Sequence, residues 1–277
     1  MLSKAIISQI RLLHHKKHRD EQGLFIVEGL KSCKEVLQSD FEVTTCYITE
    51  RHSALDAESP TFNDGSPHTS YLTPHTTYRI PHTTYRIPHT AYRISVSEMA
   101  RISCLTTAPE ILCIVKKPNY TLNELDDEKP LLVLDAIRDP GNLGTIIRTA
   151  DWFGFEQIIC SEDCVEFTNP KVIQATMGSF TRVKIVYTNL QEYLKTQTHR
   201  TVYGLYMNGE QIQKQSFHHN DIVIIGSESH GISETLLPLI NKKIEIPMYP
   251  HKNATPESLN AAMAAGVFMF EFRRCDD

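Results

Sequence analysis

The chain has 277 residues with a formal net charge of −5, and 41% of its residues are hydrophobic and 22% charged. This length accommodates one large domain or two modest ones, the composition is that of an ordinary soluble globular protein, and the negative charge argues against a nonspecific coat for nucleic acid. No apolar run is long enough to span a bilayer, and the seven scattered cysteines without a CxxC pair are typical of reduced thiols, so we expect a cytoplasmic protein without a metal site.

The first expected elements form a small module in which helices and strands alternate. Apolar residues recur at helical spacing over 3–15, strands are expected over 23–29 and 41–49, and a helix is expected over 30–40. This order is typical of a small α/β module. The first nineteen residues contain five basic residues and no acidic one, which gives a local positive patch. A nucleic-acid contact and a solvated helix face explain this patch equally well.

A repeat of seven residues follows the module. PHTSYLT, PHTTYRI, PHTTYRI and PHTAYRI begin at Pro67, Pro74, Pro81 and Pro88. A proline in every unit excludes a continuous helix and therefore a coiled coil. We interpret residues 67–94 as a flexible or loosely packed insertion made by local duplication, although the histidines and arginines leave a metal-binding or RNA-contacting role open.

An acidic, polar stretch, PNYTLNELDDEK, separates these segments from the rest of the chain. We therefore predict a first domain over 1–117, a linker over 118–129 and a second domain over 130–277. In the second domain, short apolar strands alternate with helical patterns as far as the C-terminus. Near-continuous apolar strands indicate a mostly parallel sheet covered by helices, and ligands of such sheets bind beyond the carboxyl ends of the strands.

The first polar sequence at such a strand end is DPGNLGTIIRTADWFG, residues 139–154, which follows the apolar run LLVLDAIR. We expect a glycine-containing loop and then a helix over 144–153. Gly141 and Gly144 lack the G-x-G-x-x-G spacing of a dinucleotide-binding turn, which argues against a nicotinamide-dependent oxidoreductase. Asn142 and Arg148 lie near the start of the helix, where an arginine can bind a phosphate close to the positive end of the helix dipole. A surface ion pair is the other explanation for the arginine.

The second strand end is IIGSESHGIS, residues 224–233. Gly226 and Gly231 bracket Glu228 directly after a fully apolar strand. Glycines allow the backbone to approach a ligand closely, and the carboxylate is then held at the edge of the sheet. A simple glycine turn with an incidental acidic residue would have the same sequence.

The third strand end is IEIPMYPHKNATPESLNAAMAAGVFMFEF. Thr255 and Pro256 form a good N-cap and first-turn pair, so we expect a helix over 256–272 that is apolar on nearly all sides. Its first turns would contain Ser258 and Asn260. A buried asparagine must satisfy its amide group, so Asn260 is either a structural hydrogen-bonding residue or part of a site.

Together the three stretches closely resemble the motifs of the SpoU (TrmH-type) RNA ribose methyltransferases of the SPOUT superfamily. DPGNLGTIIRTA resembles motif 1, GSESHGIS motif 2, and IPM with ESLNAAMAAGVFMFE motif 3. One departure is Ala261 and Ala262, where the family often has valine and a small polar residue. The N-terminal half resembles the L30e-like substrate-binding domain that precedes many members, and Phe25, Val27, Glu28 and Gly29 match its F-x-V-E-G signature.

The resemblance implies an α/β enzyme with a deep trefoil knot that uses S-adenosylmethionine to methylate a ribose 2′-hydroxyl of RNA. It also implies a homodimer, and we favour ribosomal RNA over tRNA as the substrate. The residues that the resemblance assigns to catalysis are Arg148, Asn142, Glu228, Ser258 and Asn260; those assigned to the cofactor are Gly226, Gly231, Ile246, Met248 and Leu259; and the candidate RNA contacts are Lys16, Lys17 and Arg19. The rival hypotheses are a non-catalytic RNA-binding or assembly factor and, less favoured, an NAD-dependent oxidoreductase.

Overall fold

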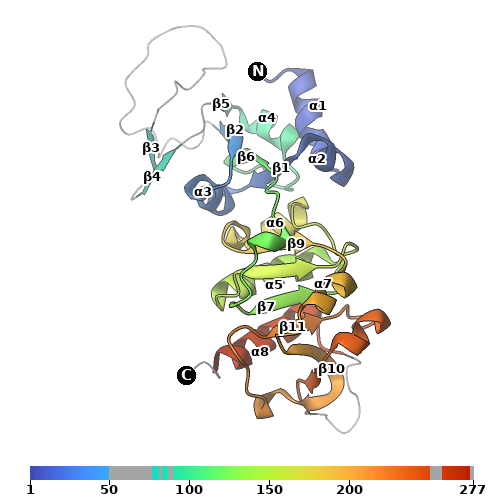
Figure 1. Cartoon of the computed structure of the whole chain (residues 1–277). Coiled ribbons are helices and arrows are strands. Elements are labelled where there is room, and N and C mark those ends of the chain that lie inside the picture. Colours follow the sequence, from blue (N-terminus) through green and yellow to red (C-terminus); the bar gives the residue numbers. More distant parts are fainter. Residues whose placement is uncertain (50–76, 81–82, 87–89, 250–257, 275–277) are drawn as a thin grey trace. The chain divides into compact units, whose positions relative to one another are not determined.

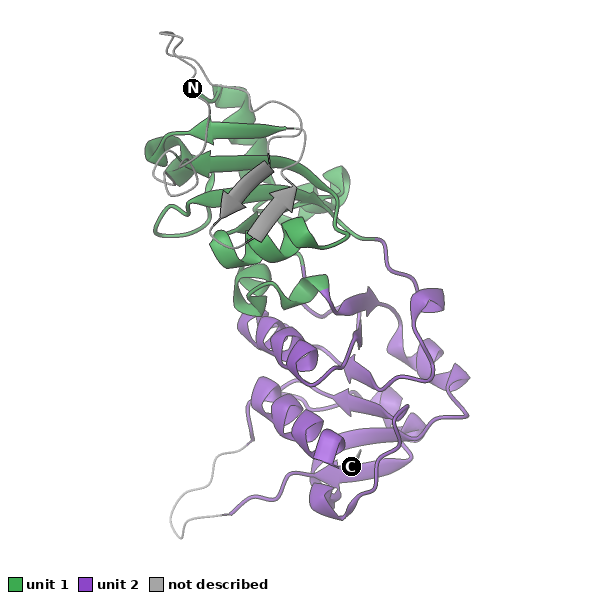
Figure 2. Ribbon diagram, turned by 90° about the vertical axis from the view of Figure 1, so that its left-hand side faces the viewer, with its two compact units in different colours: residues 1–118, 168–181 green, residues 119–167, 182–277 purple. Residues whose placement is uncertain are grey.

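The structure is a computed structural model that describes residues 1–49, 77–80, 83–86, 90–249 and 258–274 (Figure 1). The chain divides into two compact units (Figure 2). Unit 1 contains residues 1–118 and 168–181, and unit 2 contains residues 119–167 and 182–277. Within the described ranges, no helix has the length and hydropathy that a membrane span requires.

Unit 1 is built on a four-stranded sheet in the order β1-β6-β2-β5. Strand β6 is antiparallel to both β1 and β2, and β5 is parallel to β2. Its elements are α1 (Lys4–Leu12), α2 (Lys16–Gln22), β1 (Leu24–Glu28), α3 (Leu30–Gln38), β2 (Val43–Thr49), β5 (Ala91–Ile94), α4 (Val96–Ile102) and β6 (Ile111–Lys116). Local sequence explains the helix starts, because Ser3 caps α1 and Ser95 and Glu98 form a capping box at α4.

The heptad repeats are not wholly an insertion outside the fold, which corrects our expectation for residues 67–94. The last copy provides strand β5, which forms the edge of the sheet and buries Ala91 and Ile94. Two earlier copies form the antiparallel pair β3 (Thr77–Ile80) and β4 (Thr83–Arg86). The threonine, tyrosine and isoleucine of each described copy are residue types that favour strands. The first copy lies outside the described residues.

Unit 1 also contains a segment from the middle of the chain. Helix α6 (Pro170–Thr176) and the short 3₁₀ helix η3 (Ser179–Thr181) belong to this unit, and α6 packs next to β1. The ring of Phe180 is fully buried and makes edge-to-face contacts with Phe25 and Phe41. This aromatic cluster ties residues 168–181 to the core of unit 1.

Unit 2 is built on a six-stranded sheet in the order β12-β10-β11-β7-β8-β9, and all its strand pairs are parallel. Its main elements are β7 (Leu131–Leu134), α5 (Pro140–Trp152), β8 (Gln157–Cys160), β9 (Lys184–Tyr187), α7 (Leu190–Thr196), β10 (Val202–Gln211), β11 (Ile222–Ile225), η5 (Glu234–Leu239), β12 (Lys242–Glu245) and α8 (Ala261–Arg274). The predicted α/β fold with a mostly parallel sheet is confirmed.

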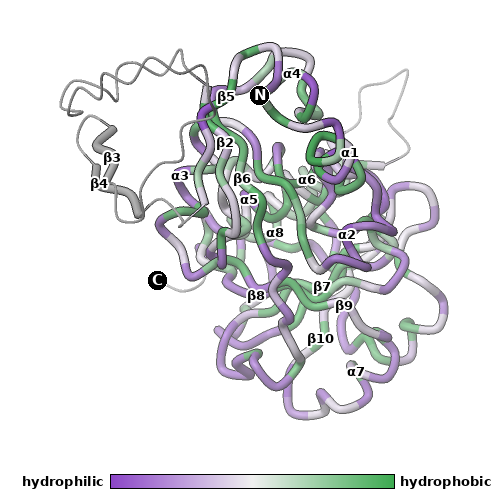
Figure 3. Tube along the Cα trace, turned by 90° about the horizontal axis from the view of Figure 1, so that it is seen from above, coloured by the Kyte–Doolittle hydropathy of each residue, from purple (hydrophilic) through white to green (hydrophobic). Residues whose placement is uncertain are grey.

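Helical elements bury the central strands of this sheet. Leu131, Val133, Ile222 and Ile224 share a core with α7 and η5, whereas α8 packs on α5 and β11. Every residue of β7 and β11 is buried, and β7 stands out as a hydrophobic stretch in Figure 3. Because β7, β11 and β12 are parallel, the three motif sequences that follow them lie at the same edge of the sheet.

Two helices of unit 2 begin at other residues than we expected. Helix α5 starts at Pro140 rather than at residue 144, because Asp139 accepts the backbone N–H of Asn142 as an N-cap and proline suits the first turn. Helix α8 starts at Ala261, after Asn260, so Ser258 precedes the helix. The proposed N-cap pair at 255 and 256 lies outside the described residues.

Candidate active site

The loop after β11 is closed by two backbone hydrogen bonds between Ser227 and Gly231, with N···O distances of 3.1 and 2.9 Å. A Cβ atom at Gly226 would lie only 2.1 Å from the carbonyl carbon of Gly231, so this position requires glycine. The tight closure exposes Glu228, Ser229 and His230 at the tip of the loop. The motif glycines therefore hold Glu228 at the sheet edge, as the sequence suggested.

Three residues predicted for catalysis meet in one hydrogen-bonded cluster. Asn142 on α5 donates from Nδ2 to Oε1 of Glu228 at 3.0 Å, and Asn260 donates from Nδ2 to Oδ1 of Asn142 at 2.9 Å. The Asn260 amide and the backbone N–H of Ala261 also donate to Oε1 of Glu228, at 2.5 and 3.1 Å. Three N–H groups thus fix one carboxylate oxygen.

Asn260 is exposed rather than buried, and it has a second role as the N-cap of α8. Its Oδ1 accepts the backbone N–H groups of Ala262 and Met263 at 3.0 and 3.2 Å. One side chain therefore ends the loop, starts the helix and orients the cluster. Both interpretations that the sequence left open for Asn260 apply.

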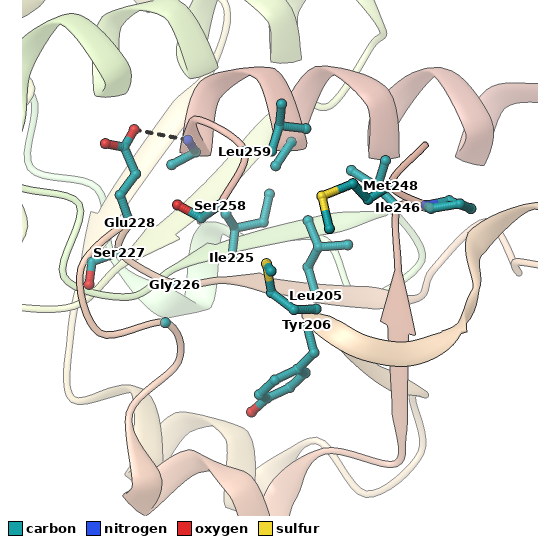
Figure 4. A pocket seen from close by; sticks show the side chains of 15 residues that line it. Leu205, Tyr206, Ile225, Gly226, Ser227, Glu228, Ile246, Met248, Ser258 and Leu259 are labelled. Carbon is teal, nitrogen blue, oxygen red and sulfur yellow. Dashed lines mark hydrogen bonds between the residues drawn. The ribbon is translucent and has the colours of Figure 1, made fainter. Parts of the chain in front are cut away.

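A pocket of about 470 Å³ opens next to this cluster (Figure 4). Leu205, Ile225 and Ala264 contribute to its mostly apolar wall, and Glu228 lies at its margin. The structure places all five residues predicted for the cofactor around this pocket: Gly226, Gly231, Ile246, Met248 and Leu259. Ser258 lines it as well.

Strand β10 contributes to the pocket through an irregularity. Its pairing with β12 shifts between Leu205 and Glu210, which both pair with Ile244, so the residues between them bulge out of the ladder. Tyr206 and Met207 in this bulge line the pocket. Burial raises the pKa of Tyr206, and its hydroxyl has no hydrogen-bond partner in the described part of the chain.

A second pocket, of about 480 Å³, adjoins the same loop, and we call it the polar pocket. It shares Ser227, Glu228, Gly231 and Ala261 with the apolar pocket, and it also contains Arg138, Asp139, Asn142 and His230. Arg138 donates to Asp163 at 2.9 Å. The Ser161 hydroxyl, which donates to Asp163 at 2.6 Å, and the Arg138 guanidinium hold the pKa of Asp163 below its usual value.

Arg138, Asp139 and His230 were not predicted as site residues from the sequence. The available signal was their position: each directly adjoins or falls inside a motif at a strand end.

Among the described residues, Arg148 makes no hydrogen bond to the cluster of Asn142, Glu228 and Asn260. It lies on α5 with Asn142, but its side chain is exposed and, in the described ranges, makes no hydrogen bond or ion pair. This free guanidinium is available to a ligand that approaches α5.

In unit 1, Lys16 and Lys17 are exposed at the start of α2, but Arg19 is not. The Arg19 side chain is almost fully buried and donates from Nη1 to the backbone carbonyls of Leu13 and His14, both at 2.9 Å. Arg19 satisfies carbonyls after the last turn of α1, so its assignment as an RNA contact is corrected. Glu28 is likewise structural: its carboxylate accepts the backbone N–H of Cys104, and burial raises its pKa.

Two family models match the chain. The SpoU rRNA Methylase family matches residues 129–270, about half of the chain, and the MRM3-like substrate binding domain matches residues 4–74. These matches confirm the resemblance that the motifs indicated. The second model ends where the repeats reach their second copy.

Individual proteins are similar over nearly the whole chain. The 23S rRNA (guanosine(2553)-2′-O)-methyltransferase of Bacillus subtilis is 26% identical over 266 residues, which cover 94% of this chain and 93% of that protein. A putative RNA methyltransferase of the TrmH family from Porphyromonas gingivalis is 28% identical with a TM-score of 0.79, covering 99% of both chains. An AdoMet-bound rRNA methyltransferase from Sinorhizobium meliloti is 24% identical and shares the fold, with a TM-score of 0.78 and coverage of 99% and 96%.

Proposed function

The chain belongs to the SpoU rRNA methylase family, and on that premise we propose that it transfers the methyl group of S-adenosylmethionine to a ribose 2′-hydroxyl of RNA. The observation that carries the proposal is the cluster of Asn142, Glu228 and Asn260 at the margin of the apolar pocket. Three distant motifs thereby place polar groups next to a cavity of cofactor size.

The residues of the apolar pocket fit S-adenosylmethionine. The cofactor combines a flat aromatic purine ring with a positively charged sulfur, and the pocket combines apolar walls with the carboxylate of Glu228. Ile246 and Leu259 would hold the purine, and Tyr206 brings a buried hydroxyl without a partner in the described residues. When bound, the cofactor supplies a methyl group on a sulfonium centre.

The chain's own residues would then position the ribose. Asn142 and Asn260 hold Glu228 through Oε1, and Oε2 makes no hydrogen bond within the described ranges, so it can accept one from the ribose hydroxyl. Arg148 would bind the phosphate of the target nucleotide by charge, because a guanidinium does not give up its proton near neutral pH. Orientation rather than a strong base is then the main contribution to rate.

The proposal is tested with the purified full chain, labelled S-adenosylmethionine, and ribosomal and transfer RNA from cells that lack the protein. We expect methyl transfer into ribose, and an Arg148→Ala variant that loses most of it. Arg182→Ala is the matched control, because Arg182 pairs with Asp151 and lines neither pocket. RNA binding without any methyl transfer would favour the non-catalytic RNA-binding factor.

Ribosomal RNA is the substrate we propose, and Lys16 and Lys17 would contribute to binding it. The match of residues 4–74 to a substrate-binding domain supports this role for unit 1. Replacing both lysines by alanine should weaken RNA binding and flatten its dependence on salt by about one unit of log-log slope per lost phosphate contact. An unchanged slope would show that the two lysines form a solvated helix face and do not contact RNA phosphates.

We also propose a cytoplasmic homodimer in which the chain has the deep trefoil knot of the family. The support for a dimer is an apolar surface on unit 2: Met263, Val267 and Phe270 lie on one face of α8, and all three are exposed. Trp152 at the end of α5 is 83% exposed. Exposed apolar side chains at helical spacing are typical of an interface.

A further inference from the structure

The polar pocket adjoins the site at which we propose that methyl transfer takes place. It shares Glu228 and Ala261 with the apolar pocket, so a ligand that fills it touches the same wall as the cofactor. At about 480 Å³ it accommodates a nucleoside. Arg138, Asp139 and His230 lie in the part of the pocket that the cofactor side does not share.

The charges of this pocket argue against a phosphate. Its lining contains one guanidinium, from Arg138, and three carboxylates, from Asp139, Asp163 and Glu228. Asp163 accepts hydrogen bonds from Ser161 and Arg138, which favour its charged form and already use both of its carboxylate oxygens. A group with a double negative charge would be repelled, whereas a neutral group with several N–H donors would be attracted.

The unused atoms define the complementary ligand. Asp139 accepts the backbone N–H of Asn142 through Oδ1 at 2.7 Å, and its Oδ2 makes no hydrogen bond to a described residue. Arg138 uses one terminal nitrogen for Asp163, and its other N–H groups are likewise unused within the described ranges. The pocket therefore offers a carboxylate acceptor next to a guanidinium donor.

We propose that this pocket binds the base of the methylated nucleotide and that Arg138 and Asp139 select guanine. Guanine presents two adjacent acceptors, O6 and N7, which match an arginine, and two adjacent donors, N1–H and N2–H, which match a carboxylate. In adenine and cytosine each N–H donor lies beside a ring acceptor, and in uracil one donor lies between two acceptors. None of these bases presents the two adjacent donors that a carboxylate binds. The inference rests on the proposed methyl transfer.

The first experiment identifies the methylated nucleoside. RNA from cells that lack the protein is methylated by the full chain and digested, and the 2′-O-methylated nucleoside is identified by mass spectrometry. We expect 2′-O-methylguanosine. A different 2′-O-methylated nucleoside would overturn the base selection but leave the proposed function intact, whereas no methylation of any RNA would instead contradict the proposed function.

The second experiment pairs changes in the base with changes in the protein. A short RNA with the mapped site carries guanine, inosine, which lacks N2–H, or 7-deazaguanine, which lacks N7. The wild-type chain should lose about 10- to 100-fold in kcat/KM with each analogue. Asp139→Asn keeps an N-cap on α5 but removes the carboxylate, so its inosine penalty should vanish, and Arg138→Lys keeps the charge but loses the fork, so its 7-deazaguanine penalty should vanish.

Three controls separate this role from a structural one. Binding of S-adenosylmethionine and the melting temperature should be unchanged in Arg138→Lys, because the residue is exposed and lies outside the apolar pocket. Glu156→Gln removes a surface carboxylate that pairs with Lys129, and it should keep both analogue penalties. An Asp139→Asn variant that still discriminates against inosine, or an Arg138→Lys variant that still discriminates against 7-deazaguanine, contradicts the assignment.

Discussion

At the scale of single residues, Asn260 joins stability to activity. Its amide oxygen caps α8, and its amide nitrogen donates to Glu228 and Asn142. The two functions use opposite ends of one side chain, so substitutions can separate them.

We expect Asn260→Ala to lower the free energy of unfolding by about 1 kcal/mol, because it removes the N-cap of α8. Asn260→Ser keeps a cap oxygen and should unfold like the wild type, yet both variants should lose most of their methyl transfer. Denaturant titrations and kcat/KM measure the two effects. Full activity in Asn260→Ser would show that the amide nitrogen has no part in the site.

Ala136 lies at the end of β7 and lines the polar pocket with a φ of 57°, a region that residues with a Cβ rarely adopt. Ala136→Gly should therefore raise the free energy of unfolding by roughly 0.5–1 kcal/mol, after the entropy cost of glycine is subtracted from the strain. Ala150→Gly, at a buried position in the last turn of α5, is the control and should lower it by about 1 kcal/mol. A destabilised Ala136→Gly would mean that the strain is absent.

The sequence motifs predicted the residues of the hydrogen-bonded cluster, but the charge of Arg19 did not predict that its side chain is buried. The motifs indicated Asn142, Glu228 and Asn260, and the structure brings them together. Arg19 was misjudged because its charge predicts a surface position, whereas the carbonyls that it satisfies belong to a turn that only the fold creates. No local pattern separates a basic residue that binds a partner from one that binds its own chain.

At the scale of elements, the glycines of the β11 loop have different roles. Gly226 faces the backbone of Gly231, whereas a Cβ atom at Gly231 would meet open space but at a φ of +67°. Gly226→Ala should therefore open the loop, displace Glu228 and abolish detectable cofactor binding. Gly231→Ala should cost only the strain, about 1–2 kcal/mol, and leave binding measurable by calorimetry. Equal effects of the two variants would contradict this account.

Element boundaries were predicted less well than element types. The sequence of Asp139 and Pro140 is a good helix start, but the nearby glycines suggested a longer loop. For α8, the sequence predicted a start at residue 256, whereas the described helix begins at Ala261, and the hydrogen bonds from Ala262 and Met263 identify Asn260 as its N-cap. The strand in the last heptad was missed because the four repeats were judged together, whereas among the described residues the last copy joins the four-stranded sheet and β3 and β4 pair with each other.

At the scale of the whole molecule, the proposed dimer can be tested by substitutions on the exposed apolar face of α8. Phe270 is 58% exposed and follows Met263 and Val267 along one side of the helix. Phe270→Glu would place a charge in a desolvated interface and should yield monomers, whereas Phe270→Leu should remain dimeric. Sedimentation velocity distinguishes the two. A wild-type chain that sediments as a monomer would refute the interface.

The general architecture followed from hydrophobic patterns, because strands buried on both faces imply a parallel sheet with helical cover. The membership of residues 168–181 in unit 1 did not follow from them. Helix α6 has the same kind of apolar face as its neighbours, and nothing in that pattern says which sheet it will join.

The chain passes between the two units three times, after residues 118, 167 and 181. A protease that nicked the segment over 119–129 would therefore produce two fragments without separating them. The C-terminal fragment would still contribute α6 and Phe180 to the core around Phe25, and this packing would hold the two fragments together. The two fragments would behave as a complementing pair of peptides rather than as independent modules, because the N-terminal fragment expressed alone would lack residues 168–181 of its own core.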